Sequence, residues 1–258
     1  MCDLSKIQFV FIIGAPRSGT TWLYALIGNH PDVAATPEVE QTFFSRYLPP
    51  VVEGWETELY HIKRGAWVQG LPYLWTEEEF DSFVQYFLEK VYVKILEKKP
   101  DARIIIDKAP EYSHHVKLIK RFVPNAKFIH IVRDGRAVAS SVMPLDWGPN
   151  TIINAAHFWA EKVCYGLAAE SSYKELVMRV KYEDLVSNPV DTLKKLCSWL
   201  NLEYETNMVS GTGFKVTDYC AKQHALIGEK PNRSRINAWI SNLKDREIEI
   251  FESLTDNV

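Results

Sequence analysis

The chain has few cysteines, no long hydrophobic run and no excess of basic charge, and each of these features excludes a class of protein. Its four cysteines are widely spaced and form no Cys-x-x-Cys pair, so neither a zinc site nor a disulfide framework is indicated. The first apolar run, at 9–13, is too short for a signal peptide or a membrane span. The formal net charge of −3 gives no basic field for nucleic acid. We therefore expect a soluble, cytoplasmic protein with no membrane span and no nucleic-acid partner.

Length and composition fit one globular domain. The 258 residues are 47% hydrophobic and 24% charged, which is enough for one sizeable core and gives no sign of a second domain. Helical patterns separate four apolar runs rich in β-branched residues, as they do in a doubly wound α/β sheet. These predicted strands are 8–13, 103–106, 127–132 and 176–180. We therefore predict a single domain over residues 1–258, with a P-loop-type parallel sheet flanked by helices.

Capping residues and prolines mark the ends of several predicted helices. Glu79 follows Thr76 at the spacing of a capping box, so a helix should begin after Thr76 and extend to about Lys98. Asn188 should cap another helix, with Pro189 as its first residue, that ends near residue 200. The remaining predicted helices are 18–28, 112–122, 136–143 and 152–172.

The stretch 9–23 runs from an apolar strand through a glycine-bounded loop into a helical pattern. Gly14 and Gly19 have the spacing of the phosphate loop of nucleotide-binding proteins, in which backbone N–H groups surround anionic oxygens at a helix N-terminus. The lysine that reaches a β- or γ-phosphate in that motif is Thr20 here, and the basic side chain of the loop is Arg17 instead. The stretch therefore predicts a phosphate site that is poorly suited to the terminal phosphate of ATP.

A second basic position follows the apolar run 127–132. Arg133 stands where this strand ends, at the sheet edge where α/β proteins bind ligands, and Ser141 follows on the next predicted helix. A guanidinium and a hydroxyl can hold a second phosphate. Arg133 could equally form an ion pair with Asp134 or Glu183, and the residues alone leave both interpretations open.

Together, these motifs resemble those of the sulfotransferases that use 3′-phosphoadenosine 5′-phosphosulfate (PAPS), in the bacterial and Golgi-type branches that include tyrosylprotein and heparan sulfotransferases. Residues 14–22 are similar to that family's 5′-phosphosulfate loop, and residues 131–141 are similar to its 3′-phosphate motif. Residues 181–189 are similar to a third family element that follows a late strand. The resemblance extends from residue 9 to about 239. It implies transfer of the sulfuryl group of PAPS to an acceptor hydroxyl, with PAP as the second product and no metal required.

The resemblance also implies roles for individual residues. The loop 17–21 would hold the 5′ end of PAPS, Arg133 and Ser141 would hold its 3′-phosphate, and Trp22 would pack on the adenine. Lys108, at the end of a predicted strand, would contact the leaving phosphate during catalysis. The late segment 230–239 is similar to a family loop that closes over the 3′-phosphate. The cofactor-binding candidates are Arg17, Ser18, Gly19, Thr20, Thr21, Trp22, Arg133, Ser141, Tyr182, Arg233, Ser234 and Arg235.

The same resemblance places a catalytic base shortly after the first predicted helix. Glu40 matches the glutamate of a family stretch similar to Lys-Glu-x-x-Phe-Phe, although the lysine before it is absent here. Glu38 competes for the role, because the tyrosylprotein branch places its glutamate slightly earlier. Cytosolic sulfotransferases have a base histidine two residues after the lysine, where this chain has Pro110. We therefore favour Glu40 over Glu38, and a glutamate over a histidine.

Aromatic residues are frequent between Phe43 and Trp75, where no periodicity is evident. This stretch belongs to an acceptor or lid region that we expect at about 37–100. It fits either the core of an irregular region or an aromatic-lined acceptor pocket. The second interpretation favours a hydrophobic, aromatic or lipid-like alcohol, and the low net basicity argues weakly against a polyanionic glycosaminoglycan.

Two other functions fit part of the sequence. A small-molecule kinase would use the same loop, but the loop lysine is absent, and Asp107, the one candidate for binding Mg²⁺, is followed at once by Lys108. A nucleotide-binding module without chemistry of its own would not need a base, so the presence of Glu40 beside the phosphate motifs argues against it. The sequence does not determine the acceptor or the oligomeric state.

Overall fold

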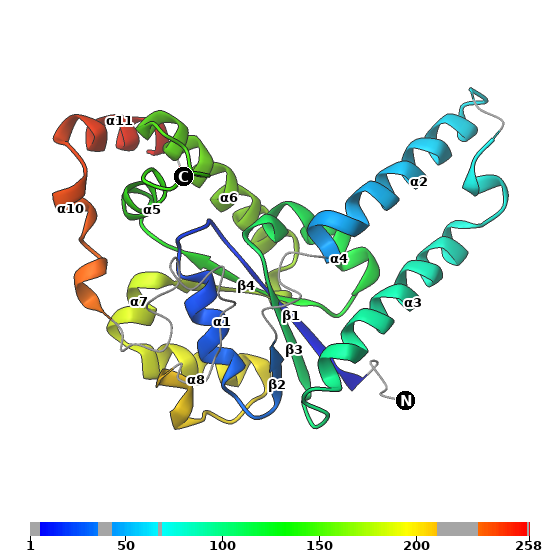
Figure 1. Ribbon diagram of the computed structural model, residues 1–258, viewed down its shortest axis with the longest axis horizontal. Helices are drawn as coiled ribbons and strands as arrows, with labels where there is room; N and C mark the ends of the chain where they lie inside the picture. Colours follow the sequence, from blue (N-terminus) through cyan, green and yellow to red (C-terminus); the bar gives the residue numbers. More distant parts are fainter. Residues whose placement is uncertain (1–5, 36–42, 67–68, 211–231, 257) are drawn as a thin grey trace.

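A five-stranded parallel sheet forms the centre of the described part of the chain (Figure 1). The structure, a computed structural model, describes residues 6–35, 43–66, 69–210, 232–256 and 258. The strands lie in the order β2-β3-β1-β4-β5, and each neighbouring pair is parallel. They are β1 (Gln8–Ile13), β2 (Val33–Ala35), β3 (Ile104–Lys108), β4 (Lys127–Val132) and β5 (Val177–Lys181). The predicted parallel α/β fold is confirmed.

Helices flank the sheet, and short helical turns join them to the strands (Figure 1). The α-helices are α1 (Thr20–Gly28), α2 (Leu48–Lys63), α3 (Glu77–Leu96), α4 (Val116–Phe122), α5 (Gly135–Val142), α6 (Ile152–Ser172), α7 (Tyr182–Ser187), α8 (Pro189–Leu200), α10 (Trp239–Asn242) and α11 (Asp245–Thr255). The short turns are η3 (Phe43–Tyr47), η4 (Leu71–Tyr73), η5 (Pro110–His115), η6 (Lys174–Leu176), η7 (Thr206–Ser210) and η8 (Arg233–Arg235). Among these described helices, none combines the length and apolar character needed to span a bilayer.

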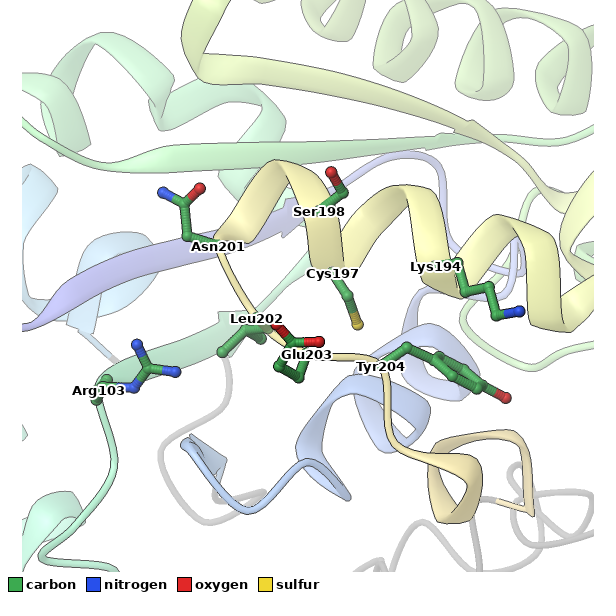
Figure 2. A pocket seen from close by; sticks show the side chains of 8 residues that line it. All are labelled: Arg103, Lys194, Cys197, Ser198, Asn201, Leu202, Glu203 and Tyr204. Atoms are coloured by element: carbon green, nitrogen blue, oxygen red, sulfur yellow. The ribbon is translucent and has the colours of Figure 1, made fainter.

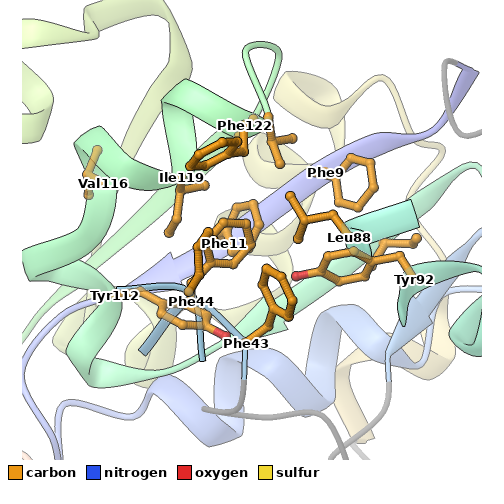
Figure 3. Close-up of a cluster of buried hydrophobic side chains, with 14 of the residues drawn as sticks. Phe9, Phe11, Phe43, Phe44, Leu88, Tyr92, Tyr112, Val116, Ile119 and Phe122 are labelled. Carbon is orange, nitrogen blue, oxygen red and sulfur yellow. The ribbon is translucent and has the colours of Figure 1, made fainter. Parts of the chain in front are cut away.

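The side chains of β1 alternate between two separate cores. Val10 and Ile12 belong to one buried cluster, which they share with α1 and α8. Phe9 and Phe11 point to the opposite face, where they join a cluster formed with α3, α4 and η5. Figure 3 shows these two phenylalanines among the other aromatic and aliphatic side chains of that cluster. Because both faces of β1 are buried, the strand is a continuous hydrophobic run rather than an alternating one.

The long and strongly patterned elements lie close to their predicted positions. β1, β4 and α6 have the predicted bounds, and β3 and β5 are displaced toward the C-terminus by one or two residues. α3 begins with the predicted capping box, in which the Thr76 hydroxyl accepts from the Glu79 N–H and the Glu79 carboxylate accepts from the Thr76 N–H. The structure therefore confirms the elements that had a clear period or a clear cap.

Short elements were missed or misplaced. β2 has three residues, too few to show a period, and η5 occupies the first part of a predicted single helix at 112–122. α8 has its predicted bounds, with Asn188 at the N-cap position and Pro189 as the first residue, but the Asn188 side chain makes no capping hydrogen bond. These short turns are set by packing on the sheet rather than by a local sequence pattern.

The segments 48–66 and 69–96, which we call the arm, contain α2, η4 and α3. Their outer part projects away from the sheet (Figure 1), whereas Leu88 and Tyr92 of α3 pack in the core with β1. Trp55 of α2 stacks on Phe80 of α3, with ring centroids 4.2 Å apart and planes within 9°. Arg121 of α4 forms ion pairs with Asp81 at 2.7 Å and with Glu56 at 3.0 Å, and thus ties the arm to the body. The expectation of an irregular backbone between Phe43 and Trp75 is wrong for α2, whose apolar residues are too sparse to show a helical period.

Candidate functional site

The loop between β1 and α1 uses backbone conformations and close contacts that require glycine at both ends. Gly14 has φ 143°, and a Cβ there would lie 2.3 Å from the carbonyl oxygen of Ile131 in the neighbouring strand. Gly19 has φ 89°, and a Cβ there would lie 2.6 Å from the ring of Tyr182. Both positions combine a positive φ with a lack of space, so any larger residue is excluded. The two glycines that suggested a phosphate loop are therefore structural requirements of its shape.

Arg17 connects this loop to the end of the adjacent strand. Its φ of 70° lies in the left-handed region, which is uncommon for a residue other than glycine and is typical of functional loops. Its Nε donates to the Oγ of Ser141 on α5 at 3.1 Å. β1 and β4 are neighbours in the sheet, so the segments that follow them emerge at one edge. The structure thus brings the predicted 5′ and 3′ anion-binding residues into direct contact.

Arg133 lies at the centre of this edge and is 9% exposed. Its guanidinium donates to the carbonyl oxygen of Arg17 at 2.8 Å and to that of Arg235 at 2.9 Å. It also lies over the ring of Tyr182, 4.3 Å from the centroid. The indole N–H of Trp159 on α6 donates to the Arg133 carbonyl at 3.1 Å. Arg133 therefore links the phosphate loop, the late segment and two helices.

The surface ion pair considered for Arg133 is not what the described residues form. Asp134 instead pairs with Arg136 at 2.8 Å and caps α5 by accepting from the Arg136 N–H. The Glu183 carboxylate accepts from the Asp134 N–H at 3.0 Å. Both candidate partners are thus used to fix the turn after β4, and the guanidinium of Arg133 remains directed at the carbonyls of Arg17 and Arg235.

Positive charge is concentrated at this edge. The pKa of Arg17 is lowered by burial and then by the charges of Arg133 and Arg235. The pKa of Arg133 is also lowered, chiefly by burial and further by Arg235, although Tyr182 and Glu183 act in the opposite direction. A partly buried guanidinium cluster of this kind is stabilised by a bound anion, which restores both solvation and charge balance. The electrostatics thus favour an anionic ligand.

Two buried hydrogen-bond donors also fit such a ligand. The Oγ of Ser18 and the Nε of Arg133 are buried and have no hydrogen-bond partner among the described residues. Buried polar groups of this kind are rare in folded proteins without a ligand. Thr20 and Thr21 follow in the first turn of α1, which contains no acidic side chain. Donors at two separate points of one edge suit a molecule with two phosphate groups.

Trp22 and Tyr182 form the apolar wall beside the loop. Trp22 is half-buried on the cluster beneath α1, and its ring meets that of Tyr182 edge-on at 6.2 Å. Tyr182 begins α7 and is 7% exposed, with its ring against Gly19 and beneath Arg133. Tyr182 therefore supports the loop from below. Stacking of Trp22 on an adenine stays a prediction.

Lys108 ends β3 and is 2% exposed. Asp107, just before it, accepts from the hydroxyls of Tyr92 at 3.1 Å and Tyr112 at 2.9 Å and from the Lys108 N–H at 2.7 Å. Burial raises the pKa of Asp107 to about 6, against the opposing effect of these hydrogen bonds. Its carboxylate is therefore occupied by structural partners. No cluster of metal-ligating side chains is present among the described residues.

The sequence did not point to Ser113, which the structure places at the phosphate loop. The Oγ of Ser113 on η5 accepts from the Gly14 N–H at 3.1 Å, in a buried hydrogen bond. His114, beside it, lies 3.1 Å from the Nζ of Lys162 and 3.2 Å from the carboxylate of Glu161. Burial, followed by the charge of Lys162, lowers the pKa of His114. A serine five residues after the strand-end lysine was the only signal, and it is too common to be specific.

The candidate bases Glu38 and Glu40 both lie outside the described residues, so their positions stay predictions. The chain resumes at Phe43, which is buried against Phe44 and Phe87. The aromatic residues that directly follow the predicted base thus belong to the core beneath the sheet.

The late candidates divide into one that contacts the site and two that do not. The carbonyl of Arg235 accepts from Arg133, as described above. The guanidinium of Arg233 donates to the carbonyl of Ser187 at the end of α7. Ser234 donates to the Asn232 side chain through both its N–H and its hydroxyl. In this structure the Arg233 side chain therefore ties the turn to α7, and the Ser234 side chain stabilises its own turn.

A separate cavity of about 670 Å³ lies away from the phosphate loop (Figure 2). Its lining comprises Arg103, Lys194, Cys197, Ser198, Asn201, Leu202, Glu203 and Tyr204. Arg103 directly precedes β3 and Asn201 follows α8, so the cavity opens near the amino-terminal ends of the strands, opposite the edge that carries the guanidinium cluster. The cavity is therefore no part of the candidate anion site.

Comparison with known proteins gives one family match and several relatives. A family model described as "Sulfotransferase family" matches residues 9–206. A putative protein-tyrosine sulfotransferase from Caenorhabditis briggsae is 29% identical over 211 residues, which cover 78% of this chain and 68% of that protein. Protein-tyrosine sulfotransferase 1 from Danio rerio is 28% identical, with 77% of this chain and 54% of that protein covered. The chain thus spans between about half and two thirds of the length of these two relatives.

Solved structures share the fold at lower identity. The sulfotransferase domain of an olefin synthase from Synechococcus PCC 7002 has a TM-score of 0.63 at 20% identity and covers 100% of this chain and 98% of its own. The sulfotransferase domain of the curacin biosynthetic pathway has a TM-score of 0.59 at 20% identity, and the match covers 96% of this chain and 98% of that domain. A mouse sulfotransferase complexed with PAP has a TM-score of 0.52 at 17% identity, and the match covers 97% of this chain and 85% of the mouse chain. At these identities the likeness establishes the fold alone.

Proposed function

The chain belongs to the sulfotransferase family, as its phosphate motifs predicted, and we propose that it transfers the sulfuryl group of PAPS to the phenolic hydroxyl of a tyrosine side chain. The observation that carries this proposal is the contact between two anion-binding elements. Arg17 of the first element donates to Ser141 of the second, and Arg133 donates back to the Arg17 carbonyl. A nucleotide with phosphates at both ends of its ribose needs such a pair of sites, whereas a nucleoside triphosphate does not.

The residues present fit the donor molecule. The loop amides, Arg17 and the buried hydroxyl of Ser18 would hold the 5′-phosphosulfate at the N-terminus of α1. Arg133 and Ser141 would hold the 3′-phosphate, with the unpartnered Nε of Arg133 as one donor. Binding would also relieve the repulsion among the three guanidinium groups. PAPS supplies an activated sulfuryl group, bonded to its 5′-phosphate, for attack by a hydroxyl.

The chain's own residues would carry the remaining chemistry. A carboxylate, Glu40 or the alternative Glu38, would accept the proton of the attacking hydroxyl. Lys108 and Arg17 would stabilise the negative charge that develops on the bridging oxygen and the 5′-phosphate. Lys108 is almost fully buried at the end of β3, and a buried cation interacts more strongly with such charge than a solvated one. A transferred sulfuryl group carries less charge than a phosphoryl group, so these cations are sufficient for the step.

The tyrosine acceptor is supported by two observations. Relatives that cover more than three quarters of this chain are named as protein-tyrosine sulfotransferases. The net charge of −3 is a poor match for a polyanionic sugar. A cytoplasmic location, an acceptor or lid region at about 37–100 and the treatment of residues 1–258 as one domain stay predictions.

Substitution of the proposed base tests the assignment most simply. Glu40→Gln keeps a side chain of similar size but cannot accept the proton, so we expect PAP binding within about twofold of wild type and a fall in turnover of about 100-fold or more. Turnover is measured as transfer of labelled sulfate from PAPS to a tyrosine-containing peptide. Glu38→Gln is the matched control and should retain activity.

The acceptor is tested separately with the unaltered protein. Labelled PAPS is offered with a tyrosine peptide, the same peptide with phenylalanine in place of tyrosine, a lipid-like alcohol and a heparan-type sugar. We expect label on the tyrosine peptide alone. Label on the sugar or the lipid alcohol, but not on the peptide, would reject the tyrosine acceptor while leaving sulfuryl transfer intact.

A further inference from the structure

The arm exposes an apolar surface that the fold buries only in part. Exposed large hydrophobic side chains in the described part of the chain gather between residues 47 and 87. On α3, Phe83 is 54% exposed, Tyr86 57% and Phe87 50%. The outer part of the arm projects from the body (Figure 1), while Phe87 also packs on Phe43 of η3, with ring centroids 5.2 Å apart. A contiguous exposed aromatic surface of this kind marks an interaction site.

α3 carries two apolar stripes where a surface helix needs one. The first stripe includes Phe80, Val84 and Leu88 at four-residue spacing and faces the core. The second consists of Phe83, Tyr86 and Phe87, at i, i+3 and i+4, and we call it the outer stripe. It borders the first stripe, because Phe87 follows Phe80 by seven residues. The outer stripe extends toward the start of α3, where the ring of Trp75 lies 5.6 Å from that of Phe83.

Charges on the same face of α3 have a definite order. Glu79 lies one turn before Phe83, while Lys90 and Lys94 lie one and two turns after Phe87. The ammonium group of Lys90 lies 4.7 Å from the centroid of the Tyr86 ring, directly over the outer stripe. The outer face therefore runs from acidic Glu79 through the aromatic residues to basic Lys90, while the charge of Lys94 is balanced by Glu97 at 2.7 Å. An antiparallel copy of this face is complementary to it in charge, whereas a parallel copy would oppose like charges.

We propose that two copies of this chain associate about a twofold axis through antiparallel α3 helices. If the twofold axis passes midway between Phe83 and Phe87, Phe83 of each copy packs against Phe87 of the other. The same register brings Glu79 of one copy within one residue's rise of Lys90 of the other, at both ends of the interface. Such an interface is isologous, because each copy contributes the same surface.

The size of this interface sets its expected strength. α3 has 20 residues and is therefore about 30 Å long. A single pair of helices of this length buries less than the roughly 800 Å² per partner of a standard interface. We therefore expect a reversible dimer with a dissociation constant in the micromolar range. The proposal does not depend on the acceptor or on the sulfuryl-transfer reaction.

Sedimentation velocity on the purified chain, from about 1 to about 200 µM, tests the proposal directly. We expect a concentration-dependent shift from monomer to dimer in the wild type. Phe83→Glu places two charges at the centre of the interface and should raise the dissociation constant at least about 100-fold. Ile240→Glu changes another exposed apolar residue, 59% exposed on α10, and should leave the dimer intact.

Charge reversal separates antiparallel pairing from any other use of the surface. Lys90→Glu alone and Glu79→Lys alone should each weaken the dimer about tenfold, because each sets like charges against one another. The double variant restores opposite charges in an antiparallel pair and should recover most of the affinity. Circular dichroism checks that each variant remains folded, since Glu79 also completes the capping box of α3. A wild type that stays monomeric, or a double variant no better than the singles, would overturn the proposal, and binding to lipid vesicles by that monomer would assign the outer stripe to a membrane instead.

Discussion

The phosphate-loop edge of the sheet and the arm differ in which side chains they bury and which they expose. At the loop edge, polar and charged side chains such as Ser18, Lys108 and Arg133 are almost fully buried. On the arm, by contrast, aromatic side chains such as Phe83 are more than half exposed. Burying a charge is costly unless a partner compensates for it, and exposing an aromatic ring leaves apolar surface unused. The loop edge is thus suited to a small anion that enters the protein, and the arm to a large apolar surface outside it.

Adding one methyl group to a glycine should distinguish the two regions most strongly. Gly14→Ala would set a Cβ 2.3 Å from the Ile131 carbonyl at a φ of 143°, so β1 and β4 would have to separate. We expect the free energy of unfolding to fall by about 3 kcal/mol or more, with loss of PAP binding. A Cβ at Gly54 on α2 would have no other atom within 4 Å. Gly54→Ala should therefore raise the free energy of unfolding by about 0.5–1 kcal/mol. Urea unfolding followed by circular dichroism measures the free energy of unfolding of both variants. Equal changes in the two would contradict the difference proposed between the loop edge and the arm.

The buried carboxylate beneath the loop should make stability depend on pH. The pKa of Asp107 is raised by burial to about 6, so between pH 4 and 6 the folded protein binds more protons at this site than the unfolded chain. Stability contributed by this group is therefore present at low pH and is lost as pH rises through about 6. Relative to Asp107→Asn, the wild type should lose up to about 3 kcal/mol between pH 4 and pH 7.

Urea unfolding of both proteins across this range gives the difference directly. The comparison cancels the titration of other groups, which both proteins share. Parallel pH profiles for the two proteins would show that Asp107 is as solvated as an ordinary surface carboxylate, against its burial between Tyr92 and Tyr112.

The smallest change in stability is expected at the N-terminus of α3, which Thr76 caps. Thr76→Ala removes the hydroxyl that accepts from the Glu79 N–H and should lower the free energy of unfolding by about 1 kcal/mol. PAP binding should not change, because the cap lies on the arm and the anion site lies at the sheet edge. Thr76→Ser keeps the hydroxyl and is the control. A loss of PAP affinity in Thr76→Ala would show that the two regions are coupled.

Much of the fold was predictable, because both faces of the central strands are buried. β1 and β4 are uninterrupted apolar runs for that reason, and the capping box at Thr76 fixed the start of α3. β2 and α7 were not predictable, since three to six residues show no period and both depend on their neighbours in the sheet. α2 was obscured by its composition, in which most residues face solvent.

The site was predictable in its parts but not in its connections. The glycine spacing and the strand-end position made the loop and Arg133 candidates for phosphate binding, although the residues alone left the role of Arg133 open. The hydrogen bond between Arg17 and Ser141 joins residues 124 positions apart, and that between Gly14 and Ser113 joins residues 99 apart. Such contacts follow from strand order, which one sequence does not specify. The exposed outer stripe of α3 was equally hidden, because aromatic residues in a sequence suggest a core before they suggest a surface.

The central claim is that one edge of the sheet holds both phosphates of a single nucleotide. Isothermal titration of the wild type with PAP and with AMP, which lacks the 3′-phosphate, tests it most directly, without Mg²⁺ in either case. The second anion site should make PAP bind about 100-fold more tightly than AMP, and Arg133→Ala should remove most of that preference. Equal affinity for PAP and AMP, or tighter binding of Mg·ATP than of PAP, would contradict the account.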